Sequence, residues 1–141
     1  MSFAQADMSA DEIDNVIVYI RNKLNRINKN DKILVIFHGG EPLLTDIAVL
    51  EKIMCNFRNE NNISFTITTN LIYELNDQIV SFFKRLCING IPTISTSWDY
   101  KIRFKSYKQE EKWICNVKQL LKEKINVFPI VSLTKYVIAD I

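Results

Sequence analysis

Apolar residues along this chain alternate between helical spacing and short β-rich runs, and this alternation restricts the folds open to the chain. From Ile13 to Ile27 they recur every three or four residues, after a Ser9–Glu12 pair that has the pattern of a capping box. The run from Lys32 to Phe37 is apolar and β-branched after its first residue. Such a run predicts a strand buried on both faces of a parallel sheet.

The same alternation repeats along the rest of the chain. Helices are predicted after caps at Thr45 and Asn76 and over 109–124, and strands over 63–69, 91–98 and 127–133. Gly90 fits the left-handed position beyond the third helix, and residues 136–141 look like the start of a fifth helix. The strands start roughly 30 residues apart, the length of a βαβ unit. The sequence therefore predicts an α/β fold with a parallel sheet and right-handed crossovers.

Composition excludes several classes of protein. The 141 residues fit one domain, and the net charge of +2 comes from mixed charges with no basic face, so no nucleic-acid partner is expected. The apolar run 33–37 is too short to cross a membrane, and the N-terminus lacks the pattern of a secretory signal. Three scattered cysteines suggest neither a disulfide framework nor a metal site, and we expect them in the core of a cytoplasmic protein.

Polar residues follow each predicted strand at its carboxyl end. The four clusters are 38–41, 68–70, 95–99 and 132–135. Ligands of parallel α/β folds bind at the carboxyl ends of the strands. The sequence therefore predicts that the four clusters share one rim.

The cluster after the first strand contains two of the three glycines in the chain, Gly39 and Gly40. Glycine lets backbone groups approach a ligand closely, and Glu41 offers a carboxylate to an ammonium group. Pro42 suits the first turn of a helix. The alternative is a tight strand-to-helix turn in which Glu41 only favours the helix N-terminus.

These motifs resemble those of a known enzyme family. His38 to Leu44, HGGEPLL, resembles the GGEP motif of radical S-adenosylmethionine (radical SAM) enzymes, in the sulfatase-maturase and peptide-modifying (SPASM-like) branch. Residues 68–70 resemble the Thr-Asn-Gly turn of that family, 97–99 resemble its Ser-x-Asp-Gly turn, and 134–141 resemble its fifth strand running into a helix. The motifs occur in the family's order and span almost the whole chain.

The resemblance implies an incomplete (βα)6 partial TIM-type barrel that lacks its first and last units. It implies that Gly39, Gly40 and Glu41 hold the methionyl amino group of S-adenosylmethionine. Asn70, Ser97 and Asp99 would lie near the carboxylate and ribose of this cofactor, or near substrate. The family cleaves the cofactor reductively at a [4Fe-4S] cluster, and the resulting 5′-deoxyadenosyl radical takes a hydrogen atom from a substrate. In this branch the substrate is expected to be a peptide or protein.

The chain departs from the family pattern in three places. Leu71 and Tyr100 stand where the family has glycine, and a Cβ disfavours the left-handed turn expected there. The CxxxCxxC motif that ligates the cluster is absent, and Cys55, Cys87 and Cys115 fall in predicted helix bodies. We therefore expect an internal fragment, residues 1–141 of a partial radical SAM core, that is inactive alone. No catalytic residue and no metal ligand are assigned.

Two other readings stay open. A non-catalytic truncated module would pair with another chain, including a second copy, through an open apolar sheet edge. An unrelated nucleotide-binding α/β domain is the third reading, but the sequence contains neither GxGxxG nor a P-loop motif.

Overall fold

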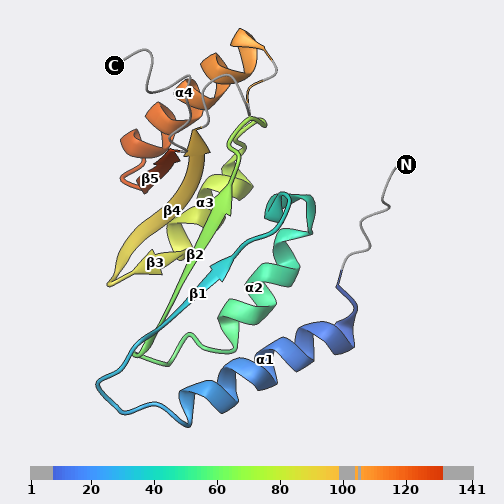
Figure 1. The fold of residues 1–141 in the computed structure, drawn as a ribbon, viewed down its shortest axis with the longest axis vertical. Helices are drawn as coiled ribbons and strands as arrows, with labels where there is room; N and C mark the ends of the chain where they lie inside the picture. The colour runs from blue at the N-terminus through green and yellow to red at the C-terminus, as the bar shows by residue number, and fades with distance from the viewer. Residues whose placement is uncertain (1–7, 99–103, 105, 132–141) are drawn as a thin grey trace.

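The fold, seen in a computed structural model that describes residues 8–98, 104 and 106–131, alternates helices and strands as predicted (Figure 1). The helices are α1 (Ala10–Leu24), the 3-10 helix η1 (Pro42–Leu44), α2 (Ile47–Cys55), α3 (Asp77–Arg85) and α4 (Tyr107–Lys122). The strands are β1 (Ile33–Phe37), β2 (Ile63–Thr69), β3 (Cys87–Ile88), β4 (Ile91–Trp98) and β5 (Asn126–Val131). The predicted α/β class is confirmed.

Four of the strands form a parallel sheet in the order β1-β2-β4-β5. Each strand lies beside the parallel strand that follows it in the chain, so their carboxyl ends lie along one edge (Figure 1). Among the described residues β1 and β5 pair with no further strand, and the sheet is not closed into a barrel.

The short strand β3 was not predicted. It pairs antiparallel with the start of β4, joined by Asn89 and Gly90, whose φ angles are 54° and 79°. Two positive φ angles in a two-residue loop define a type I′ hairpin, and Asn-Gly is its strongest sequence signal. The prediction that Cys87 lies in a helix body is therefore wrong. Gly90 is left-handed as expected, but it turns a hairpin and does not end a helix.

One face of the sheet packs against the described helices, and the other, called the uncovered face below, packs against none of them. In β1, Ile33, Val35 and Phe37 belong to or pack against the hydrophobic core, whereas the alternate residues Leu34 and Ile36 are 45% and 51% exposed. Phe128 and Ile130 of β5 are also exposed. The pairing registers from β1 across β2 and β4 to β5 place them on the same face of the sheet as Leu34 and Ile36. The prediction that the first strand is buried on both faces is therefore wrong.

Helix starts follow the predicted capping chemistry with one exception. Ser9 and Glu12 form the capping box of α1, and the Asn76 side chain caps α3 by accepting from the backbone N–H of Ile79. The cap of α2 is Asp46 and not Thr45. The prediction fails there because η1 intervenes, and Thr45 ends that short helix.

Candidate functional site

Three of the four polar clusters meet at the carboxyl edge of the sheet. The register pairs Phe37 with Ile67 and Thr69 with Thr96, so the loop after β1, the residue after β2 and the end of β4 lie on the same edge. This arrangement brings together Gly39, Gly40, Glu41, Asn70 and Ser97 at one rim. Asp99 and the cluster 132–135 lie outside the described residues.

Neither the backbone angles nor the packing of the described residues requires glycine at positions 39 and 40. Neither lies in the left-handed region, and a Cβ added to either would meet no heavy atom within 4 Å. Both residues are exposed. Their backbone therefore faces open space, where an alanine would fit as well.

The Glu41 side chain ties the loops of the rim to one another. Its carboxylate is buried, with the residue 8% exposed, and it accepts three hydrogen bonds. Oε1 accepts from the Thr69 hydroxyl at 2.7 Å and from the Leu43 N–H at 3.2 Å, and Oε2 accepts from the Asn70 N–H at 2.8 Å. A carboxylate has about four acceptor positions, so most of its capacity is used within the protein.

The turn after β2 keeps the left-handed residue that the family resemblance implies. Leu71 has a φ of 54° despite its Cβ, and its side chain is fully buried. The buried Asn116 side chain on α4 donates to the carbonyls of Leu71, at 3.0 Å, and Tyr73, at 2.7 Å. The expectation that Leu71 opposes this turn is therefore wrong, because burial and the Asn116 amide hold it. Tyr100 lies outside the described residues.

Asn70 itself is only partly engaged. Its Oδ1 accepts from the Ile72 N–H at 2.9 Å, and its own N–H donates to Glu41. No described residue accepts a hydrogen bond from its Nδ2 group. The turn therefore orients Asn70 and leaves an amide donor for a further partner.

Tyr73 extends the Glu41 network beneath the rim. Its hydroxyl lies 2.8 Å from the Thr69 hydroxyl. Burial raises the pKa of Tyr73 well above its ordinary value, the Thr69 hydrogen bond opposes this rise, and the charge of Glu41 adds to it. Tyr73 therefore stays protonated and acts as a hydrogen-bonding group of the network.

The rim residues fall on two sides of the sheet. Thr69 lies on the helix-covered face together with Ile67, and its hydroxyl donates a hydrogen bond to the Glu41 carboxylate on that face. Ser97 lies on the uncovered face, because Ser95 pairs with Thr68 and side chains alternate along each strand. The Glu41 side chain and Ser97 therefore do not converge on one ligand atom.

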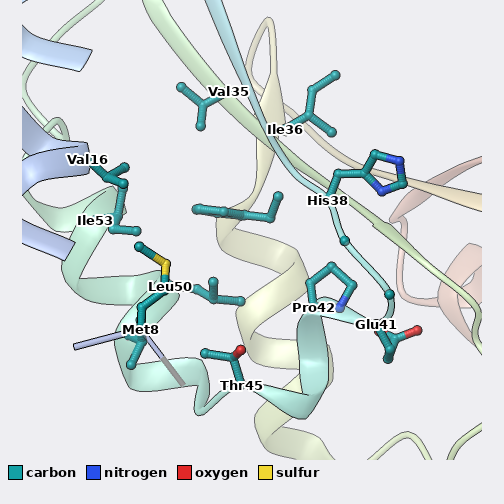
Figure 2. A pocket seen from close by; sticks show the side chains of 14 residues that line it. Met8, Val16, Val35, Ile36, His38, Glu41, Pro42, Thr45, Leu50 and Ile53 are labelled. Atoms are coloured by element: carbon teal, nitrogen blue, oxygen red, sulfur yellow. The ribbon is translucent and has the colours of Figure 1, made fainter. Parts of the chain in front are cut away.

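A cavity of about 350 Å³ runs from the Gly39–Gly40 loop along β1 toward α1 and α2 (Figure 2). Below the loop its walls are apolar: Val16, Val35, Leu50 and Ile53 line it. His38 also lines it and is exposed.

The three cysteines do not fit an iron–sulfur cluster. Cys55 and Cys115 are exposed on helices and not in the core as expected. Cys55 and Cys87 line a second cavity with Ile63, the first residue of β2, at the end of the strands opposite the rim. Within 8–98, 104 and 106–131, no group of three or more His, Cys, Asp or Glu side chains is placed to hold a metal ion.

The sequence reasoning missed Tyr73 and Asn116, which hold the turn after β2. Asn116 gave no local signal, because its partners are 43 and 45 residues away in the sequence. Its place on the apolar side of the predicted fourth helix was the one sign that its amide needs a buried hydrogen-bond partner.

Comparisons of this chain with protein-family models, with curated proteins and with solved structures found no match. No helix in the described part of the chain is long and apolar enough to span a bilayer.

Proposed function

We propose that the rim binds the methionyl head of S-adenosylmethionine, as part of a radical SAM-type domain. In this proposal the backbone carbonyls of Gly39 and Gly40 accept hydrogen bonds from the ammonium group. Asn70 and Ser97 provide polar contacts to the carboxylate or ribose. Asp99, which the resemblance also implicates, lies outside the described residues. Glu41 acts through its network, holding the loop in position, because its acceptors are largely occupied.

The space around the two glycines carries the proposal. Packing and backbone angles leave room for a Cβ at both positions, so the fold does not explain the glycines. A ligand that must touch the backbone does explain them, because a side chain there would keep it away.

The strand order supports an incomplete barrel of the (βα)6 type. Parallel strands follow one another as neighbours in chain order, and the hydrophobic core formed by the described residues lies on the helix-covered face. A doubly wound sheet would instead reverse its strand order and cover both faces. The uncovered face carries the hydroxyls of Thr68, Ser95 and Ser97 beside the rim.

Bound S-adenosylmethionine would supply a 5′-deoxyadenosyl group for radical chemistry on a peptide or protein substrate. The described residues do not form a [4Fe-4S] site. The proposed contribution of this chain is to bind and orient the cofactor.

Isothermal titration calorimetry with S-adenosylmethionine tests the proposal through Gly40→Val. Because the Cβ position is open, the variant should unfold at the wild-type temperature, while its affinity for the cofactor falls at least tenfold. Leu44→Ala, at a side chain that is 71% exposed on η1, is the matched control and should bind normally. If the wild type does not bind, or Gly40→Val binds as well as the wild type, the proposal is wrong.

A further inference from the structure

The backbone of β1 has one side free among the described residues. The N–H of Ile33 donates to the Asn62 carbonyl, so Ile33, Val35 and Phe37 direct their N–H and C=O groups toward β2. In an extended strand the alternate residues, Leu34 and Ile36, direct theirs the opposite way. Two consecutive N–H and C=O pairs of a parallel ladder therefore point outward and are available to a further strand.

β1 lacks three features of its own that normally protect an edge strand. β1 has the sequence Ile-Leu-Val-Ile-Phe, with no charge, no proline and no bulge. At the other side of the sheet β5 contains Pro129, which removes a donor from the ladder. The edge of β1 is thus the better template for strand addition.

The helix layer already extends over the space beside β1. Residues of α1 and α2 line the apolar cavity together with Val35 and Ile36, and Figure 2 shows Val16 and Ile53 across from Val35. A strand placed beside β1 would direct alternate side chains into this cavity of about 350 Å³. Its other side chains would lie beside the exposed Leu34 and Ile36 on the uncovered face.

This geometry favours a single added strand over a second copy of the chain. Because α1 and α2 line the cavity beside β1, we expect the same helices of a second copy, joined β1 to β1, to compete for this space. One extended segment needs no helix layer of its own. We propose that β1 binds one extended polypeptide segment from another chain, apolar at alternate residues, as an additional strand with side chains in the cavity.

A fluorescein-labelled octapeptide of alternating valine and threonine provides the probe, and fluorescence anisotropy the measurement. We expect saturable binding to the wild-type chain. Ile36→Pro removes an outward N–H without removing a bond to β2, and it should weaken binding at least tenfold. Ile36→Ala keeps the N–H and should bind within about threefold of wild type.

A second pair of variants tests the cavity without altering the β1 backbone. Val16→Asp places a charge in the cavity wall and should weaken binding at least tenfold, whereas Val18→Asp, 57% exposed on the same helix, should not. Thermal unfolding followed by circular dichroism checks that each variant is folded. If Ile36→Pro does not fold, the Val16 pair decides.

The proposal is overturned if the peptide does not saturate the wild type, or if Val16→Asp and Val18→Asp bind it equally. It is also overturned if the chain forms a stable dimer that Ile36→Pro dissociates, because a second copy would then occupy the edge. Peptide binding is measured without S-adenosylmethionine, so this test fails or succeeds independently of cofactor binding.

Discussion

Replacing Glu41 with glutamine tests whether its carboxylate is the clamp that joins the loops after β1 and β2. The amide keeps one acceptor oxygen and replaces the other with a donor. If the oxygen keeps Thr69 and Leu43, the new amide group faces the Asn70 N–H, which donated at 2.8 Å. One hydrogen bond to a charged acceptor is then lost, and two others become neutral.

The expected cost follows from these three contacts. A hydrogen bond to a charged group contributes about 1.5–3 kcal/mol, and a neutral one about 0.5–1.5 kcal/mol. Losing one such bond, and weakening two others by about 1–1.5 kcal/mol each, should lower the free energy of unfolding by roughly 3.5–6 kcal/mol. For a chain of this length the melting temperature should fall by roughly 10–20 °C.

Urea unfolding and thermal melts of Glu41→Gln measure this cost against Glu123→Gln. Glu123 forms an exposed ion pair with Lys84, so its substitution should cost less than about 1 kcal/mol. A double-mutant cycle of Glu41→Gln with Thr69→Val should give a coupling energy of about 1 kcal/mol or more. Equal stability of the two glutamine variants, with no coupling to Thr69, would refute the clamp.

Three further predictions concern Tyr73, Gly90 and Asn116. The pKa of Tyr73 is raised in the fold, so the folded chain keeps a proton that the unfolded chain loses above its pKa near 10. The free energy of unfolding of the wild type should therefore fall by about 1.4 kcal/mol per pH unit above that pH. Urea titrations from pH 8 to 11 measure this fall, and Tyr73→Phe should abolish the part due to Tyr73. Gly90→Ala should lower the free energy of unfolding by about 1–2 kcal/mol in the same assay, because the φ angle of Gly90 is 79°. Gly40→Ala should leave it unchanged. Equal values for the two variants would contradict the hairpin assignment. Asn116→Ala should cost roughly 2–3 kcal/mol by leaving the carbonyls of Leu71 and Tyr73 without their donor, and a cost under 0.5 kcal/mol would show that the turn holds itself.

Local chemistry predicted the elements of this fold where the signal lay within a few residues. The Ser9–Glu12 capping box, the Asn76 cap and the β-branched run of β1 needed no distant partner. Parallel pairing followed from the spacing of the strands and correctly placed three polar clusters on one edge. The Asn89–Gly90 hairpin also has a signal confined to neighbouring residues. It was not predicted because Gly90 was assigned to the end of a helix.

Tertiary contacts decided the features that the sequence analysis got wrong. An apolar run does not show which face of a strand the helices leave open, so the exposure of Leu34 and Ile36 could not be read from it. Likewise, Glu41 looked available to a ligand because its donors, Thr69 and Asn70, lie 28 and 29 residues away. The left-handed Leu71 is held by a helix that begins 36 residues later in the sequence, at Tyr107.

Backbone amide chemical shifts during a titration with S-adenosylmethionine test the central claim most directly. We predict that shifts concentrate at Gly39, Gly40, Asn70 and Ser97, with little change at Cys55 and Cys87 at the opposite end of the strands. An absence of shifts, or shifts confined to that opposite end, would contradict the proposal that this rim is a cofactor site.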